Sequence, residues 1–559
     1  MPDTNQQSVF FVDDDLIERL MRGDALTDAN KPKRAVESDA LAKAVELASA
    51  GRVDDAIREL EAAVQKGEQP ADVYASLGHL YYEKKSWENA ARHYRTVAER
   101  EPSHRTAHYN LGLSLERLGK LEEAAHEFES AANNDAATWQ PLAGRAFCLL
   151  KLGKPEESLA CFDSALELAA QSGKNVNLDR ILNGKAVALQ QTGRMDEAAE
   201  LYKKLLPANP NSPGLLSNFI AVSMARKDDA RVKELAERLL KTQPEAPQAL
   251  QGLAAVATSR GDFSAAVQYC SQLVKAAPDS YVGWFNLGIA YQKTGRWEQA
   301  GNAYKEAALI RPAAVEASAN LGAVLQERGD FAGARRAYER VLAISPDLPG
   351  ALWNLALVAE REGHADQAES YFAKLVAVNP DWEDAAFRLG YLQLQRHDYA
   401  GAVRSFEMCV QKRADWLEAL LNLALAQWKS GDAQSAAETY RGVLAVSGGN
   451  TEALRALTVL AIDRRDGGEA REMLRQFGAA GGRSGDLAYN VGLFLQSSGD
   501  HAGAVEAYRT AINVKPDFAE ALLNLGHALK ANGEEQEAQL AWSQAVAAAP
   551  ELASTYFPQ

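Results

Sequence analysis

Residues 281–314 have the sequence YVGWFNLGIAYQKTGRWEQAGNAYKEAALIRPAA. Apolar side chains recur at helical spacing in the first and second halves of this stretch, and Gly295 lies between the two patterns. A glycine in this place is typical of the C-terminal cap of a helix, and Pro312 is placed to end the second helix. The stretch therefore predicts a helical hairpin.

The same glycine and proline recur along the chain every 34 residues. The place of the proline is occupied by Pro210, Pro244, Pro278, Pro312, Pro346, Pro380, Pro516 and Pro550. The place of the glycine is occupied by Gly261, Gly295, Gly329, Gly363, Gly431, Gly499 and Gly533. Because one period sets both residues, the sequence predicts a tandem array of helical hairpins.

The period also divides the chain into segments. Gly51, Gly119 and Gly153 keep it upstream, but Gly193 comes six residues late, which places an insertion near this point. We expect an N-terminal segment with a short amphipathic helix at 1–36, repeats 1–4 at 37–172, the insertion at 173–178, repeats 5–15 at 179–552 and a C-terminal tail at 553–559.

The hairpin at 281–314 resembles a tetratricopeptide repeat. The family's signature positions are matched by Trp284, Leu287, Gly288, Tyr291, Ala300, Tyr304, Ala307 and Pro312. About fifteen such repeats cover nearly all of the chain. The resemblance implies an all-α fold, a right-handed superhelical solenoid of antiparallel helix pairs, with a groove that binds other proteins.

Composition and charge narrow the classes of function. Hydrophobic residues make up 47% and charged residues 24%, so the chain has enough apolar material to fold. The formal net charge of −15 would repel a phosphate backbone, which argues against a nucleic acid partner. The start of the chain lacks the pattern of a secretory signal, and no apolar run is long enough to cross a membrane. We expect a cytoplasmic protein that binds neither nucleic acid nor membrane.

Motifs of catalysis and cofactor binding are missing from the sequence. It contains no phosphate-binding glycine loop, no dinucleotide fingerprint and no nucleophile elbow. The four cysteines form no C-x-x-C pair, as expected for reduced thiols inside helices. His104 and His108 share a helical face but lack the glutamate of a zinc motif. The sequence therefore predicts a protein that is not an enzyme and holds neither a cofactor nor a metal.

Asparagine recurs on one face of the first helix of the repeats. Positions 4, 7, 8 and 11 of a repeat form the buried stripe, so positions 2, 5, 6, 9, 12 and 13 fall on another face. The family resemblance places this face in the groove. Position 6 is asparagine in eight repeats: Asn110, Asn218, Asn286, Asn320, Asn354, Asn422, Asn490 and Asn524.

A side-chain amide offers an acceptor and two donors, so it can bracket a peptide unit of an extended chain. The row of asparagines is similar to the ladder in the tetratricopeptide arm of O-linked N-acetylglucosamine transferases, which holds substrate backbones. This similarity predicts a peptide-binding ladder. The alternative is that the amides bond to the neighbouring repeat, and the sequence leaves both interpretations open.

Aromatic residues at position 5 lie beside this ladder: Tyr109, Phe285, Trp353, Phe387 and Tyr489. Exposed on the groove they would favour partner binding, and the alternative is that they pack against the next helix. Lysine or arginine at position 13 of several repeats predicts either a basic row or solvated helix ends.

These patterns predict a protein–protein interaction scaffold that binds extended polypeptide segments along its groove. One alternative is the substrate-recruiting subunit of an enzyme complex such as a glycosyltransferase, since no catalytic region follows the repeats. Another is a scaffold that associates with itself as a homo-oligomer. The apolar residues 9–12, VFFV, and the short amphipathic helix after them either dock on a groove of the same or a neighbouring copy, or cap the first hairpin.

Overall fold

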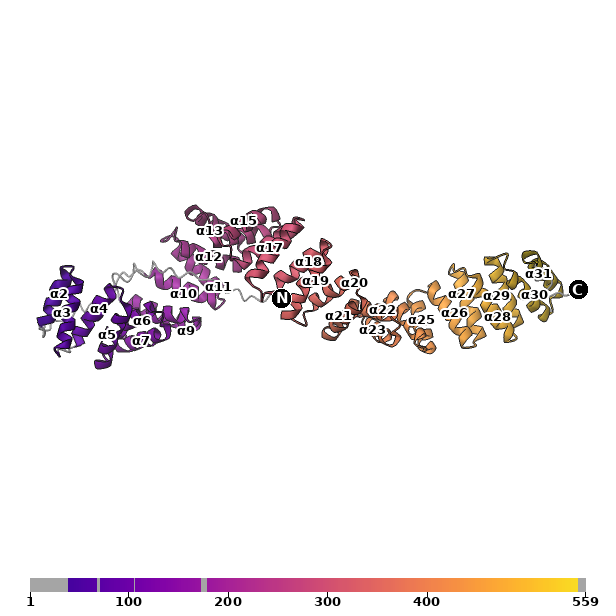
Figure 1. Ribbon diagram of the computed structural model, residues 1–559, viewed down its shortest axis with the longest axis horizontal. Coiled ribbons are helices and arrows are strands. Elements are labelled where there is room, and N and C mark those ends of the chain that lie inside the picture. The colour runs from indigo at the N-terminus through magenta and orange to yellow at the C-terminus, as the bar shows by residue number, and fades with distance from the viewer. Residues whose placement is uncertain (1–38, 68–70, 105, 172–177, 551–559) are drawn as a thin grey trace. The chain divides into compact units, whose positions relative to one another are not determined.

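The computed structural model describes residues 39–67, 71–104, 106–171 and 178–550. Within these ranges the chain forms thirty α-helices, α2 to α31, and no β-strand (Figure 1). The all-α expectation is confirmed. The segment expected at 1–36, residues 173–177 of the insertion and the tail at 553–559 lie outside the described residues.

The chain divides into two compact units, an N-terminal unit of residues 1–303 and a C-terminal unit of residues 304–559. The N-terminal unit contains α2 (Asp39–Ser49), α3 (Val53–Gln65), α4 (Ala71–Glu83), α5 (Trp87–Arg100), α6 (Ala107–Arg117), α7 (Leu121–Asn134), α8 (Gln140–Lys151), α9 (Pro155–Gln171), α10 (Asp179–Gln191), α11 (Met195–Leu205), α12 (Pro213–Ala225), α13 (Asp229–Thr242), α14 (Pro247–Ser259), α15 (Phe263–Ala276) and α16 (Tyr281–Lys293).

Helix α17 (Trp297–Ile310) includes the boundary between the two units. The C-terminal unit continues with α18 (Val315–Glu327), α19 (Phe331–Ile344), α20 (Pro349–Arg361), α21 (Ala365–Val378), α22 (Glu383–Gln395), α23 (Tyr399–Lys412), α24 (Leu417–Lys429), α25 (Ala433–Val446), α26 (Thr451–Asp463), α27 (Gly467–Ala479), α28 (Gly485–Ser497), α29 (His501–Val514), α30 (Ala519–Ala531) and α31 (Glu535–Ala548).

The helices are paired as the period predicts. Within each unit the first helix of a repeat packs against the second helix of the same repeat, as α4 does against α5 and α28 against α29. First helices also contact the first helices of the next repeat, for example α12 with α14 and α26 with α28. These first helices therefore lie side by side.

The turn between the two helices of a repeat needs a left-handed backbone. Gly295 has φ +73°, and the flanking N–H groups of Gly295 and Arg296 donate to the carbonyls of Gln292 and Tyr291 at 3.1 and 2.8 Å. These bonds satisfy carbonyls left free at the helix end. In four repeats a non-glycine residue holds a positive φ at this place, Lys85, Lys227, His397 and Arg465, which explains why the glycine series has gaps there.

The second helix often begins at an aspartate. Asp398, for example, accepts a hydrogen bond from the N–H of Gly401 at 3.0 Å, and Asp500 accepts one from Gly503 at 2.8 Å. A side-chain oxygen in this place satisfies an N–H group that the helix itself leaves unpaired. The same contact starts α13, α15, α19, α25 and α27.

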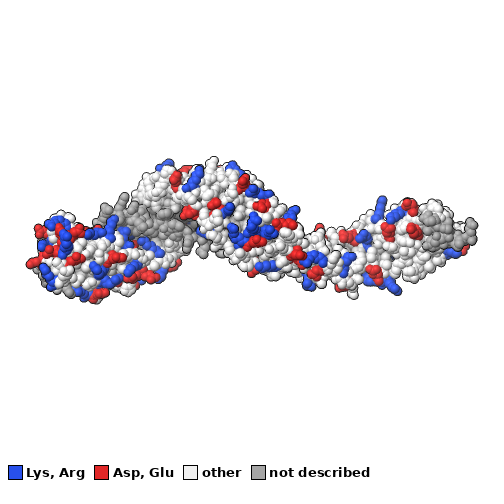
Figure 2. Space-filling view, viewed as in Figure 1, with Lys and Arg blue, Asp and Glu red and all other residues white. Residues whose placement is uncertain are grey.

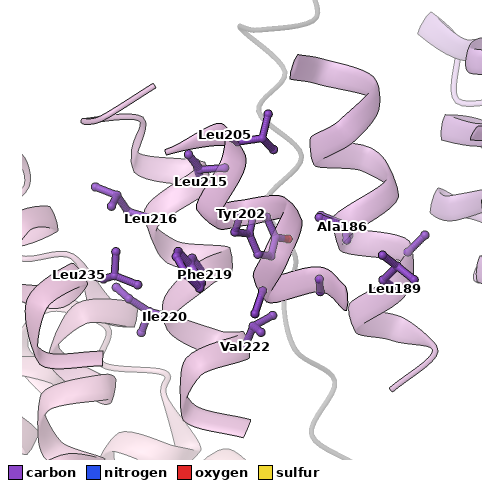
Figure 3. Packing of buried hydrophobic residues seen from close by; sticks show 14 of the residues in the cluster. Ala186, Leu189, Tyr202, Leu205, Leu215, Leu216, Phe219, Ile220, Val222 and Leu235 are labelled. Carbon is purple, nitrogen blue, oxygen red and sulfur yellow. The ribbon is translucent and has the colours of Figure 1, made fainter. Parts of the chain in front are cut away.

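An aromatic residue at position 24 fills the space between helices of one repeat and the next. Tyr202 of α11 is fully buried and lies between Ala186 on α10 and Phe219 on α12 (Figure 3). The rings of Tyr202 and Phe219 stack with their centroids 5.7 Å apart. Close-packed contacts of this kind join neighbouring repeats through shared hydrophobic clusters.

The four cysteines are free thiols, and Cys148, Cys270 and Cys409 are buried. Burial raises the pKa of each of these three thiols to about 12. A thiol that is not ionised near neutral pH is a poor nucleophile and a poor metal ligand. These cysteines therefore pack as small apolar residues, as the sequence predicts.

The repeat formed by α26 and α27 is expected to open before its neighbours. Its small residue at position 8 is replaced by Thr458, which is buried and donates to the Leu454 carbonyl of its own helix at 2.8 Å. Such a bond weakens a helix, and Gly467 and Gly468 at the start of α27 weaken the next one. Hydrogen exchange should be fastest over residues 447–485. Uniform protection along the C-terminal unit would contradict this.

Candidate protein-binding face

The surface that carries the candidate residues is made by the first helix of each repeat. We call positions 2, 5, 6, 9, 12 and 13 of these helices the A face. In the N-terminal unit a hollow of about 470 Å³ lies on this face between α2, α4 and α6. Its lining includes Leu41, Val45, Asp72, Ala75, Ser76, His79 and Asn110, all from A-face positions. These residues therefore line the hollow together with side chains of the buried stripe and of second helices.

In the C-terminal unit the A-face positions of neighbouring repeats also reach one another. Arg388 at position 6 pairs with Glu360 at position 12 of the preceding repeat, with Nη1 and Oε2 3.3 Å apart. Asn524 at position 6 donates to the hydroxyl of Tyr489, at position 5 of the preceding repeat, over 3.1 Å. Groups on this face are thus close enough to act together on one ligand.

The eight asparagines are exposed to different degrees. Asn218 is only 4% exposed, Asn490 is exposed, and the other six are half-buried: Asn110, Asn286, Asn320, Asn354, Asn422 and Asn524. Asn422 donates to the carbonyl of Glu418, one turn earlier in its own helix, at 2.8 Å. The row is therefore not uniform along the chain.

Two of the asparagines interact with a tyrosine of the preceding repeat. Tyr304 is fully buried at position 24, which raises the pKa of its hydroxyl, and a hydrogen bond with Asn320 opposes that rise. Asn218 likewise opposes the burial-driven rise in the pKa of Tyr202, although neither the Tyr202 Oη nor the Asn218 Nδ2 is in hydrogen-bond geometry with a described atom. The amide at position 6 thus lies beside the tyrosine sixteen residues earlier.

The sequence repeats this association. Asparagine follows tyrosine at this distance in five pairs, Tyr94 and Asn110, Tyr202 and Asn218, Tyr304 and Asn320, Tyr338 and Asn354, and Tyr508 and Asn524. The exception is Tyr440, which is followed by Ala456. Where the earlier residue is Phe128, position 6 is Gly144, whose Cα lies against the ring. Buried hydroxyl groups need partners, and Asn320 serves Tyr304 in this way. The hydroxyls of Tyr338 and Tyr508 instead donate to Oε1 of Gln326 and Oε1 of Gln496, at 3.4 and 2.7 Å.

The other three asparagines follow Cys270, Phe406 and Leu474, which have no hydroxyl to satisfy. They are Asn286, Asn422 and Asn490. Asn490 is the most accessible of the eight, and its side chain makes no hydrogen bond to a described residue. It is the asparagine whose amide is best placed for a partner.

The position 5 aromatics are built into aromatic clusters. Trp353 stacks on Trp382 with ring centroids 5.2 Å apart and meets Phe372 at 5.5 Å. Phe387 with Phe406 and Trp416, and Tyr489 with Tyr508 and Phe518, repeat this arrangement. Tyr109 is 7% exposed and packs on Phe128, while Phe285 is half-buried and stacks on Tyr281. Packing within the protein covers much of the surface of each ring, and only the remaining surface could contact a partner.

Position 9 carries a row that the sequence reasoning did not single out. In five successive repeats of the C-terminal unit it is large and apolar, and the residues are half-buried or exposed: Leu357, Tyr391, Leu425, Val459 and Leu493. The signal was present in the sequence, because position 9 lies outside the buried stripe and should be polar if it only faced water.

Two of the charged candidates have local partners. Lys151 at position 13 pairs with Glu116 at 3.2 Å. His108 contacts Glu127 through Nδ1 at 2.6 Å and the Pro102 carbonyl through Nε2 at 3.1 Å. Among the described residues no group of three or more His, Cys, Asp or Glu is placed to hold a metal ion. Figure 2 shows cationic and anionic side chains interspersed over the face in view.

Single substitutions should distinguish an asparagine that bonds a buried tyrosine from one that is exposed and has no such partner. Asn320→Ala removes the partner of the buried Tyr304 hydroxyl and is expected to lower the free energy of unfolding by about 1–3 kcal/mol. Asn490→Ala changes an exposed amide and should stay within about 0.5 kcal/mol of the parent. Hydrogen exchange of α18 and α28 measures both. Equal losses in the two variants would show that the tyrosine contact does not matter.

Models of known families match most of the chain. Models of the tetratricopeptide repeat match residues 41–94, 76–138, 140–211, 225–281, 280–347, 325–389 and 418–446, and a further model of the TPR repeat matches residues 494–533. Together these ranges span well over half of the sequence. The chain belongs to the tetratricopeptide repeat family. It is thus a helical repeat protein of the kind that serves as a scaffold for protein–protein interactions.

Solved structures of similar fold share little sequence with it. YrrB, a tetratricopeptide protein with an unusual peptide-binding site, is 16% identical, with a TM-score of 0.31, over 34% of this chain and 98% of YrrB. A chain of the Cut9–Hcn1 hetero-tetramer of the APC/C is 13% identical, with a TM-score of 0.32, over 86% of this chain and 94% of the matched chain. The pilF protein of Pseudomonas aeruginosa is 20% identical, with a TM-score of 0.30, over 38% of this chain and 96% of pilF. No curated protein matches the chain. Scores this low carry no argument about function, so the family assignment comes from the repeat models.

None of the described helices is both long and apolar enough to span a membrane.

Proposed function

We propose that this tetratricopeptide protein is a binding protein, without chemistry of its own, that holds extended polypeptide segments on its A face. The hollow between α2, α4 and α6 is the observation that carries the proposal. Val45 is 59% exposed there, beside the polar side chains of Ser76 and Asn110. An extended segment brings unpaired backbone groups and apolar side chains, and this lining matches both.

The rest of the A face supports the same activity. The amide of Asn490 is accessible, and the apolar row at position 9 continues over five repeats of the C-terminal unit. The net charge of −15 favours a polypeptide over a nucleic acid as the partner. We also infer that the protein acts in the cytoplasm, where its free thiols stay reduced.

Peptide selection on the full chain tests this function. Peptides enriched from a display library of disordered segments should bind the parent and lose about tenfold or more in affinity on Val45→Glu, which places a charge in the hollow. The matched control is Gln65→Glu, the same charge change at an exposed residue that ends α3. If no peptide is enriched, or if Val45→Glu binds as the control does, the hollow is not the binding site.

A further inference from the structure

A row of apolar side chains at position 9 lies on the A face of the C-terminal unit. Tyr391 is 45% exposed and Leu493 is 39% exposed, and between them lie the half-buried Leu425 and Val459. Most surface positions with a single apolar residue need no explanation, but one position that is apolar in successive repeats does. Because α22 contacts α24 and α26 contacts α28, Tyr391 and Leu425 are neighbours on the A face, as are Val459 and Leu493.

Further apolar side chains adjoin this row. Position 12 of three of these repeats is apolar and half-buried, at Leu394, Trp428 and Ile462. Residues three apart on a helix are neighbours on its surface, so each lies beside the position 9 residue of its own helix. We call positions 9 and 12 from Leu357 to Leu493 the apolar strip.

Acidic residues accompany the apolar strip at position 2. In the C-terminal unit this position is Glu316, Asp384, Glu418, Glu452, Asp486 or Glu520 in six repeats, and all six are exposed. Asp486 pairs with Lys515 at 2.7 Å, and Asp384 lies 3.9 Å from Arg413. Glu418, Glu452 and Glu520 form no ion pair with any described residue. Two carboxylates along the strip and a third in the repeat after it are therefore available to a partner.

Helix geometry alone does not explain the acidic residues at position 2. An acidic residue in the first turn stabilises any helix through the helix dipole. In the N-terminal unit, however, position 2 of successive repeats is Asp72, Thr106, Gln140, Arg180, Gly214, Gln248 and Val282, with one acid among them. The same helix dipole acts in both units. Four of the six acids belong to repeats of the apolar strip and the other two to repeats next to it, which is charge complementarity toward a cationic ligand.

We propose that the apolar strip and its acidic row bind an extended, positively charged polypeptide segment that carries an apolar side chain at about every third residue. The spacing follows from the distance of about 8–10 Å between packed helices, set against about 3.3 Å for each extended residue. Lysine or arginine between the apolar residues meets the carboxylates at position 2. This inference rests on the proposed function and names the class of partner for the C-terminal unit.

Fluorescence anisotropy with the full chain and designed peptides tests it. The probe has about 15 residues, with leucine at every third position and lysine and serine between. Two matched probes replace all its lysines by glutamate or all its leucines by serine. We expect the first probe to bind, more weakly as salt is added, and each matched probe to bind at least about tenfold more weakly.

Two triple variants separate the acidic row from net charge. Glu418→Gln with Glu452→Gln and Glu520→Gln removes three charges from the A face, and binding of the lysine probe should fall about tenfold. The control removes the same charge from exposed positions of second helices, with Glu407→Gln, Glu438→Gln and Glu506→Gln. It should change affinity less than about twofold. All six residues are exposed, so both proteins should keep the parent fold.

The double variant Tyr391→Ser with Leu493→Ser tests the apolar strip. It should also weaken binding of the lysine probe about tenfold. Failure of the lysine probe to bind, equal binding of the glutamate probe, or equal losses in the two triple variants would each overturn the inference. Peptides selected on the hollow of the N-terminal unit would still depend on Val45 in that case, so the proposed function is judged separately.

Discussion

Replacing Phe128 by alanine is expected to lower the free energy of unfolding of the repeats around it by about 3–5 kcal/mol. The ring is 0% exposed and lies against two glycines, Gly112 of its own repeat and Gly144 of the next one. A Cβ built on either glycine would come within 2.9 or 2.8 Å of it. Alanine would leave a cavity between the two repeats, and rigid helix backbones close such a cavity poorly.

The loss should extend across the junction, because Phe128 touches both repeats. Hydrogen exchange by mass spectrometry should show faster exchange in α6 and α8 as well as in α7, which carries the residue. Phe128→Leu keeps most of the apolar volume and should cost less than half as much. If only α7 exchanges faster, the ring does not connect the repeats and the prediction is wrong.

The sequence predicts the helix pairs well because their determinants are local. A glycine with φ +73°, such as Gly295 or Gly261, ends the first helix within a few residues of the pattern that forms it. The four places where the period lacks its glycine could not be interpreted in this way. Lys227 and His397 hold φ values of +57° and +63° there, so packing of the two helices imposes the turn on residues that do not favour it.

The candidate site was harder to predict, because its side chains take partners from another repeat. Asn320 could be placed on the A face from periodicity, yet its partner is Tyr304, sixteen residues upstream on the second helix of the preceding repeat. A helix-by-helix analysis does not connect them. The association of Tyr304 with Asn320, repeated in four other pairs, could have been found by comparing each position 6 with the preceding position 24.

The aromatic residues at position 5 show the same limit. Their spacing gives the A face, but Trp353 also meets Trp382 in the loop before the next repeat, and a loop residue has no helical periodicity to predict it. Packing against a neighbouring helix and exposure to a partner each describe part of these rings. Each ring packs against its own repeat with one side and remains half-exposed on another, except for the buried Tyr109.

Gly492→Ala is the second substitution for which we expect a large effect, a loss of about 1–3 kcal/mol in the free energy of unfolding. The new Cβ would lie 2.5 Å from Cε1 of Tyr508, closer than two carbon atoms can approach. The tyrosine cannot easily turn away. Its ring is 0% exposed, and its hydroxyl donates to Oε1 of Gln496 at 2.7 Å, so moving the ring also breaks a hydrogen bond.

A matched control separates this clash from the general effect of alanine in a helix. Gly442 lies inside α25 with nothing within 4 Å of its added Cβ, so Gly442→Ala should raise stability by up to about 1 kcal/mol through helix propensity alone. Hydrogen exchange of α28 and α29 for Gly492→Ala, and of α25 for Gly442→Ala, should therefore change in opposite directions. Stabilisation by both substitutions would mean that the Tyr508 ring moves away from the added methyl group without cost.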